Sequence, residues 1–396
     1  MVRAIFVLFF LIASVKAHQH KATIGQRTTD CQHIAVECGQ TVTSAVAPDG
    51  KIWRVWSQQQ QLFYQVSSND GQHFAPAIKV DIAPEEISSR GENRVKIAFD
   101  RQGGIYLSWA SPREKRFTAD IRFSYSLDNG QSFAVATTIN DDGLLAGHSF
   151  NEMQVSDSGK VSLIWLDSRD KVLAADKSAV NGSSIYFAEG WPRKNDLAFN
   201  NQRLVSGTCQ CCRLAFDTNQ QGEAALLWRH IYQQNTREFA LLTLDGKKEP
   251  VKVSDDRWQI NGCPHQGGAL SIDRNNRYHM TWYNQGEKGK GIFYAYSDDQ
   301  GSHLSQPLAF GNNGKNAAHP HMLSWKNRVD IVWLEANDSG YSLWHSSSND
   351  YGKTFTSAKQ LHQVKGSADR PFVIAGSKSP LVSWHSANQQ HWIHAL

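Results

Sequence analysis

A short apolar run that ends in tryptophan recurs seven times along the chain of 396 residues, and this repeat constrains the fold more than any other feature. Neighbouring tryptophans are between 51 and 63 residues apart, and they are Trp56, Trp109, Trp165, Trp228, Trp282, Trp333 and Trp384. A period of this length indicates one supersecondary unit that is repeated and packed against its neighbours. We therefore expect seven equivalent units.

Further apolar runs flank the tryptophan runs. Alternating runs such as VKIAFD, CRLAFD and GALSID precede them, and runs such as LFYQVS, IRFSYS and HWIHAL follow them. Polar or glycine-containing turns separate the runs, and no amphipathic helical window of convincing length interrupts them. The pattern predicts an all-β chain of small sheets arranged radially, which protects the sheet edges.

An eight-residue signature follows the third run in four of the units. Its copies are SSNDGQHF (67–74), SLDNGQSF (126–133), SDDQGSHL (297–304) and SNDYGKTF (348–355). They resemble the Asp box, Ser-x-Asp-x-Gly-x-Thr-Phe, of sialidase-like (BNR-repeat) β-propellers, with Asn69 at the aspartate position of the first copy and Leu304 ending the third. In such a turn the carboxylate or amide accepts backbone N–H groups, glycine supplies a positive φ, and the aromatic ring packs on the sheet.

Longer stretches such as GENRVKIAFD, WLDSRD and DRWQINGCPH resemble those of secreted bacterial BNR-repeat proteins. The seventh unit ends after its third run, so we expect its outer strand to come from the N-terminal segment. We therefore predict a seven-bladed β-propeller over residues 43–396, closed by residues 18–42. True sialidases have six blades, so the resemblance implies the fold more strongly than the activity.

The first 17 residues have the features of a secretory signal peptide. Arg3 precedes an apolar run from Ala4 to Val15 that is too short to span a bilayer, and Val15-Lys16-Ala17 forms a small-residue cleavage site. Removal of this segment leaves 39 basic and 37 acidic side chains, without a clustered basic run. We expect a periplasmic or secreted protein with no membrane anchor after cleavage and no nucleic-acid partner.

The candidate ligand-binding residues are arginines at corresponding places in different units. In a propeller, the segments that lead into the innermost strands share one face with the loops between second and third strands. The arginines on these segments are Arg94, Arg169, Arg213, Arg229 and Arg370. Several guanidiniums at one channel mouth suit a carboxylate or phosphate group. The sequence therefore predicts binding of an anionic small molecule or acidic glycan.

The sequence does not decide whether the protein is an enzyme. The resemblance to sialidases implies an arginine triad, a tyrosine nucleophile with a glutamate partner, and an acid, but the Phe/Tyr-Arg-Ile-Pro segment of that family is absent from this sequence. Weak substitutes are Glu92, Glu152 and Asp167 as acid or base, and Tyr232 and Tyr283 as nucleophile. The alternatives are an exo-sialidase-like glycoside hydrolase, a lectin-like binding protein and a non-catalytic scaffold for a partner protein.

The cysteines suggest a second kind of site. Three of the six are clustered before the fourth unit and a fourth precedes the next unit together with a histidine; these residues are Cys209, Cys211, Cys212, Cys263 and His265. Disulfides are one interpretation in an oxidising compartment, although cysteines one or two positions apart rarely meet disulfide geometry. The other is a Cu or Zn site of a metal-handling propeller. Cys31 and Cys38 are expected to form a disulfide in a small N-terminal loop.

Overall fold

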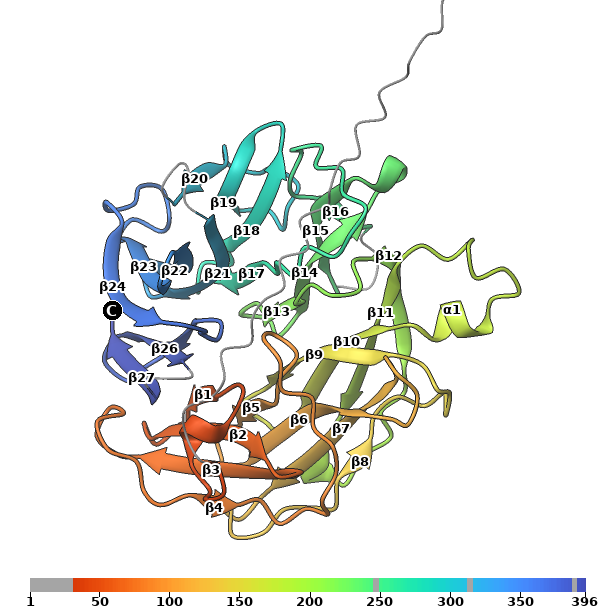
Figure 1. Cartoon of the computed structure of the whole chain (residues 1–396), viewed down its shortest axis with the longest axis vertical. Coiled ribbons are helices and arrows are strands. Elements are labelled where there is room, and N and C mark those ends of the chain that lie inside the picture. Colours follow the sequence, from red (N-terminus) through yellow and green to blue (C-terminus); the bar gives the residue numbers. More distant parts are fainter. Residues whose placement is uncertain (1–30, 245–248, 312–315, 387–389) are drawn as a thin grey trace, which may run out of the picture.

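The computed structural model describes residues 31–244, 249–311, 316–386 and 390–396, and this part of the chain is all-β. Its helical elements are short: η1 (Val36–Cys38), α1 (Arg169–Leu173), η2 (Pro192–Lys194) and η3 (Gln233–Asn235). None of the helices in the described ranges is long and apolar enough to cross a membrane. Figure 1 shows the sheets arranged around the middle of the molecule, with the red N-terminal strands beside the blue C-terminal strands.

The strands form antiparallel sheets of consecutive strands. The first two sheets have four strands each: β1 (Thr43–Val46), β2 (Ile52–Gln58), β3 (Gln61–Ser67) and β4 (Ile78–Lys79), then β5 (Lys96–Phe99), β6 (Ile105–Pro112), β7 (Ala119–Ser126) and β8 (Thr137–Thr138). An eight-stranded sheet follows: β9 (His148–Val155), β10 (Val161–Asp167), β11 (Ser183–Gly190), β12 (Gln202–Thr208), β13 (Ala215–Thr218), β14 (Ala224–Ile231), β15 (Arg237–Thr243) and β16 (Val251–Lys252). Its two halves are joined by one residue pair, Thr208 with His230.

Three further sheets complete the described chain. They are β17 (Ala269–Ile272), β18 (Tyr278–Gly286), β19 (Gly289–Ser297) and β20 (Leu308–Phe310); β21 (Asn316–Trp325), β22 (Arg328–Asn337), β23 (Gly340–Ser348) and β24 (Lys359–Lys365); and β25 (Phe372–Ala375), β26 (Pro380–Ser386) and β27 (Gln390–Ala395). The apolar runs expected as first, second and third strands therefore form strands, and the prediction of an all-β chain is confirmed.

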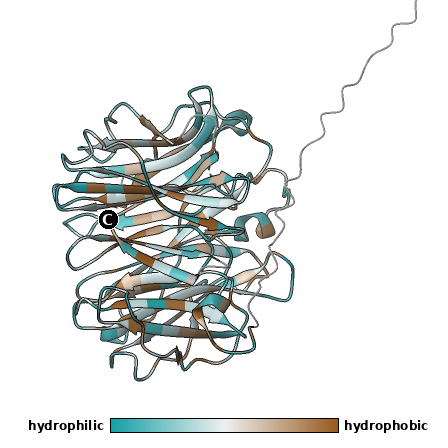
Figure 2. Ribbon diagram, turned by 60° about the vertical axis from the view of Figure 1, so that its left-hand side comes forward, coloured by the Kyte–Doolittle hydropathy of each residue, from teal (hydrophilic) through white to brown (hydrophobic). Residues whose placement is uncertain are grey.

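The repeated tryptophans form the core. Each lies in the second strand of its group, on β2, β6, β10, β14, β18, β22 or β26, and each is at most 2% exposed. In the described residues, six clusters of buried hydrophobic side chains each join one group of strands to the next. Figure 2 shows hydrophobic residues, in brown, on strands throughout the molecule. The core is thus a series of interfaces between sheets.

The Asp-box turns have the hydrogen bonds that their sequence predicts. In the last copy, the Ser348 hydroxyl donates to Asp350 Oδ1 at 2.6 Å and accepts the Gly352 N–H at 2.8 Å. The other three copies repeat both bonds. Tyr351 and Gly352 have φ values of 60° and 79°, so the turn places two residues in succession in the left-handed region.

Each box packs on the sheet before its own. Gly352 lies against Tyr294 of β19, and Gly130 lies against Tyr64 of β3. The first box has no preceding sheet in the chain, and its Gly71 packs against Ile393 of β27 instead. The Asp boxes therefore link neighbouring sheets, and one of these links joins the first sheet to the last.

The first strands follow one another in a closed series of contacts. β1 contacts β5, and the contacts continue through β9, β13, β17, β21 and β25, which in turn contacts β1. His391 of β27 reinforces this last contact: its Nε2 is 3.3 Å from Ser44 Oγ, and its Nδ1 is 3.3 Å from Arg54 Nη1. Burial, and then the charge of Arg54, hold the pKa of His391 well below its usual range, so the neutral ring accepts the Arg54 hydrogen bond.

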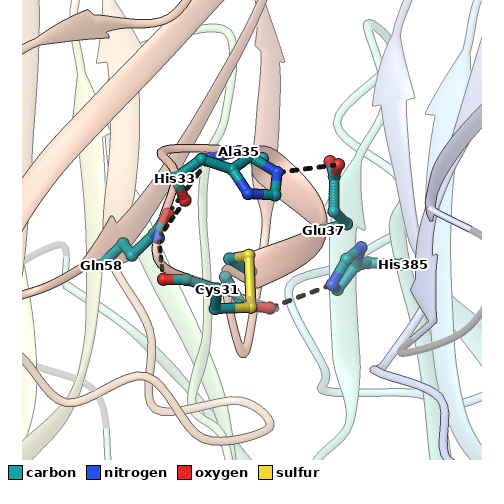
Figure 3. The surroundings of a disulfide bond; sticks show 8 residues. Cys31, His33, Ala35, Glu37, Gln58 and His385 are labelled. Carbon is teal, nitrogen blue, oxygen red and sulfur yellow. Dashed lines mark hydrogen bonds and ion pairs between the residues drawn. A yellow bond between two sulfur atoms is a disulfide. The ribbon is translucent and has the colours of Figure 1, made fainter. Parts of the chain in front are cut away.

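The predicted disulfide between Cys31 and Cys38 is present beside η1. Figure 3 shows Gln58 beside it, and the Gln58 amide donates to the carbonyls of Cys31 and His33. Residues 31–42 contain no strand, and the described part of the last sheet has three. The expected signal peptide and residues 18–30 of the segment predicted to close the ring lie outside the described residues.

The close approach at Gly352 generates a stability prediction. A Cβ at Gly352 would lie 1.8 Å from the Tyr294 hydroxyl, whereas one at Gly222, with a similar φ of 78°, meets nothing within 4 Å. Gly352→Ala should therefore lower the free energy of unfolding by about 2 kcal/mol more than Gly222→Ala, because only the first adds overpacking to backbone strain. Urea unfolding measures both, and equal losses would contradict the packing role of the box.

Candidate functional site

The first strands line a central cavity of about 290 Å³. Side chains from β1, β5, β9, β13, β17, β21 and β25 all reach it, as expected for the innermost strands of a propeller. A larger hollow of about 580 Å³ lies between the first two sheets beside the Cys31–Cys38 disulfide. The central cavity is the better candidate, because three of the arginines singled out by the sequence, Arg94, Arg213 and Arg370, lie at its edge.

We call that edge the mouth and define it by Glu92, Arg94, Arg213, His319, Arg370 and Phe372. The half-buried Phe372 ring is its centre: the Arg94 guanidinium lies 4.5 Å and the Arg213 guanidinium 5.6 Å from the ring centroid. Both arginines are buried, at 1% and 3% exposed. Two guanidiniums from different sheets thus share one aromatic face, as cation–π contacts favour.

Arg94 is fully engaged by protein groups. Its Nε donates to the Gly91 carbonyl at 2.6 Å, its Nη1 donates to the Val42 carbonyl at 3.2 Å, and its Nη2 pairs with Asp369. The buried ion pair with Asp369 compensates the cost of removing the guanidinium from water. Arg94 can contribute positive potential at the mouth, but it has few donors left for a ligand.

Arg213 faces Glu92 and His319. Its Nε and Nη2 donate to the Gly268 carbonyl at 3.1 and 2.5 Å, while its Nη1 is 3.5 Å from Glu92 Oε1. Glu92 Oε1 and His319 Nδ1 lie 3.9 Å apart, and neither atom has a hydrogen-bond partner among the described residues. Glu92 is 5% and His319 8% exposed. A buried polar atom without a protein partner can be satisfied by an ordered water, an ion or a ligand.

His319 is neutral in this setting. Burial, followed by the charges of Arg370 and Arg213, holds its pKa well below the usual range. Arg370 itself is half-buried, and no described residue makes a hydrogen bond or ion pair with its guanidinium. Its backbone N–H donates to Asp369 Oδ1 at 2.7 Å, the same atom that pairs with Arg94. Arg370 is therefore the cation at the mouth that is available to a ligand.

The other two arginines lie in separate networks. Arg169 pairs with Asp167 at 2.9 Å and with Asp141 at 2.7 Å, and Asp167 also accepts the indole N–H of Trp165 at 2.8 Å. Asp142, His148 and Asp167 come close enough to resemble a metal site, but the Arg169 Nε lies 3.1 Å from Asp142. This guanidinium already compensates the carboxylates, so the cluster is an ion-pair network.

Arg229 is held by backbone carbonyls. Its Nη2 donates to Tyr283 at 2.6 Å and to Gln266 at 3.2 Å, and its Nη1 donates to the Asn284 side chain at 3.1 Å. The side chain also lies over the Phe239 ring at 4.5 Å. The convergence expected for five arginines is therefore limited to Arg94, Arg213 and Arg370, because Arg169 pairs with Asp141 and Asp167 and Arg229 bonds to groups of the adjacent sheet.

The remaining catalytic candidates are engaged or poorly suited to their suggested roles. Glu152 pairs with Lys96 at 2.6 Å inside the cavity. Burial, followed by the Glu238 charge, raises the pKa of Tyr232 to about 12, and burial also raises the pKa of Tyr283, whose hydroxyl donates to Gln285. A raised phenol pKa disfavours a nucleophilic tyrosinate.

Two residues of the site were not singled out by the sequence as site residues: Asp369 and Phe372. Both lie within SADRPF, where Asp369 precedes β25 and Phe372 begins it. The sequence shows where these residues lie in the repeat. It does not show that Asp369 pairs with Arg94, which is 275 positions away.

The predicted cysteine cluster is formed by the turn between β12 and β13. Cys209, Cys211 and Cys212 are buried, and their sulfurs lie 3.8 Å (Cys209 to Cys211) and 3.4 Å (Cys209 to Cys212) apart. Thiol donation from its neighbours lowers the pKa of Cys209, while burial raises the pKa of Cys212 to about 12. The exposed Cys263 interacts with Cys209 and Cys211. His265 is exposed and acts electrostatically on His319 of the mouth.

Comparison with known proteins identifies the fold. No family model and no curated protein matches the chain. Similar solved structures include an ulvan lyase bound to -[GlcA(1-4)Rha3S]- (TM-score 0.55, 9% identity, 92% of this chain and 95% of that chain), the BP39L lectin from Burkholderia pseudomallei (0.54, 9%, 91% and 99%) and the Hadza microbial sialidase Hz136 (0.52, 10%, 88% and 75%). At such identities the likeness shows the fold alone, which is a sialidase-like propeller.

Asp217, a cavity residue on β13, generates a pH prediction. Burial raises its pKa to about 6, although Ile272 and Thr218 donate backbone N–H groups to it. Its folded pKa exceeds its unfolded value, so its stabilising contribution is complete below about pH 4 and is lost as the pH rises through about 6. Relative to Asp217→Asn, the free energy of unfolding of the wild-type protein should fall by about 3 kcal/mol between pH 4 and 7.

Urea unfolding at a series of pH values checks this expectation. The exposed Asp338→Asn is the matched control and should leave the wild-type pH profile unchanged. A constant difference between wild type and Asp217→Asn over this range would show that the carboxyl does not titrate there.

Proposed function

We propose that the chain is a secreted, seven-bladed, sialidase-like propeller that binds an anionic glycan at the mouth. The two halves of the eight-stranded sheet count as separate blades, since each has its own four strands and tryptophan and only one residue pair joins them. Residues 18–42 would supply the outer strand of the last blade after residues 1–17 are removed as a signal peptide.

The observation that carries the proposal is the set of unpartnered polar groups at the mouth. The Arg370 guanidinium lacks a partner in the described part of the chain, and Glu92 Oε1 and His319 Nδ1 are buried without hydrogen bonds. A guanidinium fork matches a carboxylate or sulfate, while a carboxylate oxygen and a neutral imidazole accept the hydroxyl hydrogens of a sugar. An acidic sugar satisfies all three groups together.

The arginines with protein partners support the same ligand. Arg94 is paired with Asp369, and Arg213 is fixed by the Gly268 carbonyl and faces Glu92, so the mouth keeps the net positive charge of Arg370. A charged cleft with low-dielectric walls focuses its field and attracts an anion. The ulvan lyase and the lectin with similar folds bear names that refer to carbohydrate, and the lyase was solved with a glucuronic acid-containing saccharide. Both are consistent with a glycan ligand here.

Binding is favoured over sialidase chemistry. Neither named tyrosine forms a hydrogen bond with a glutamate of the described chain: the Tyr283 hydroxyl donates to Gln285, and the buried Glu238 acts on Tyr232 only through its charge. Of the candidate acids, Asp167 and Glu152 already have cationic partners within 3.0 Å. Glu92 alone keeps an oxygen without a hydrogen bond, so any turnover would depend on it.

Arg370→Ala tests the binding site. The variant should weaken binding of sialyllactose or a glucuronic acid oligosaccharide by about 10-fold or more, because a charge-assisted hydrogen bond is lost. Arg101→Ala, which removes an exposed arginine paired with Asp157, is the matched control and should bind as the wild type does. Isothermal titration against each acidic sugar and its neutral counterpart provides the measurement.

The same titrations separate the alternatives. Equal affinity for acidic and neutral sugars, or unchanged affinity in Arg370→Ala, would contradict the anionic site. Sugar release that Glu92→Gln abolishes would identify a hydrolase at the same mouth. If the protein binds none of these sugars, a protein-binding scaffold becomes the better hypothesis.

A further inference from the structure

We propose that Cys209, Cys211, Cys212 and Cys263 bind one soft metal ion, Cu(I) or Zn(II), through their sulfur atoms. This site is distinct from the mouth and does not depend on the proposed glycan binding. It narrows the metal hypothesis raised by the sequence to the three neighbouring sulfurs of the turn and to Cys263, whose thiol interacts with Cys209 and Cys211.

The spacing of the sulfurs supports a metal centre. Four sulfurs that surround an ion tetrahedrally at about 2.3 Å lie about 3.8 Å from one another. The Cys209 sulfur lies 3.8 Å from that of Cys211 and 3.4 Å from that of Cys212, and all three lie within 4.8 Å of each other. Thiolates select Cu(I) and Zn(II) over harder ions.

The turn is built to hold its sulfurs in place. The Cys209 N–H donates to the Arg229 carbonyl on β14 at 2.9 Å, which fixes the start of the turn. Phe150 packs against the three cysteines and shields them from water. Cysteines one to three positions apart within such a turn do not readily reach disulfide geometry, whereas they can all point at one ion.

Cys263 completes the set from a different loop. It is exposed, and its thiol interacts with those of Cys209 and Cys211. Three buried ligands and one at the surface give the ion a route in and out. The arrangement therefore suits a metal that is loaded or exchanged after folding.

The charge of the centre is also compensated. Four thiolates around Zn(II), or three around Cu(I), carry a net charge of −2, which needs cations nearby in a buried site. Arg229 acts electrostatically on Cys212, and Arg237 acts on Cys263. Both arginines are buried, and their Nε atoms have no hydrogen-bond partner among the described residues. Two guanidiniums thus match the charge of the loaded site.

The test uses the full mature chain, purified anaerobically and loaded separately with Cu(I) and with Zn(II). We expect one ion per chain by elemental analysis, sulfur-only coordination by X-ray absorption, and a thiol count that falls when the metal binds. Competition with a chromophoric chelator gives each affinity and decides between the two ions.

Two variants and two controls make the result specific. Cys263→Ser changes an exposed position, should fold normally, and should weaken binding by at least about 10-fold. Cys212→Ser should abolish it. The double variant Cys31→Ser/Cys38→Ser removes the distant disulfide and should keep the metal, as should Arg370→Ala. Four accessible thiols that bind neither ion, or native protein with these cysteines paired as disulfides by mass spectrometry, would overturn the proposal.

Discussion

The burial of the repeated tryptophans is the interaction on which the rest of the structure depends. Six of the seven lie between neighbouring groups of strands, and Trp56 packs with Val36 and Val42 of the N-terminal segment. Sheets of three or four short strands are not stable alone and must cover both faces. A linear stack would leave the first and last sheets with an uncovered face. The contact of β1 with β25 and of Gly71 with Ile393 removes both ends, so residues far apart in the chain can be fixed around one cavity.

Some charged groups of the mouth are paired within the protein, and others have no hydrogen bond to it. Arg94 is buried, and its guanidinium pairs with Asp369. Lys96 likewise pairs with Glu152. Such pairs are costly to form but more costly to break, so they hold the channel lining in one arrangement. Within this frame, Glu92 Oε1 and His319 Nδ1 lack hydrogen bonds to the described residues, and a fixed arrangement of such groups would lower the entropy lost on binding the proposed ligand.

The cysteine turn lies directly next to this frame. Cys212 is followed by Arg213, which bonds to the Gly268 carbonyl and faces Glu92. Gly268 in turn lies five positions after Cys263 on the adjacent segment. The two segments that contribute sulfurs therefore also contribute to the mouth, so a metal between them would stabilise the geometry of the proposed glycan site.

Local patterns in the sequence determined most of the fold. Alternating apolar residues located the strands, the Ser-x-Asp-x-Gly spacing located the turns, and the short separation of Cys31 and Cys38 predicted their disulfide, because each depends on nearby residues. The strand expected from residues 18–42 does not occur in residues 31–42.

Only the tertiary structure decided which side chains meet. The repeat places five arginines at corresponding positions: Arg94, Arg169, Arg213, Arg229 and Arg370. Of these, Arg169 pairs with Asp141, and Arg229 bonds to backbone carbonyls. The guanidinium of Arg370 has no partner among the described residues. Equivalent positions in a repeat share a backbone geometry. The partners of their side chains, however, come from adjacent sheets whose loops differ. Packing and charge between distant segments therefore decide which residues pair, and no local sequence pattern shows this.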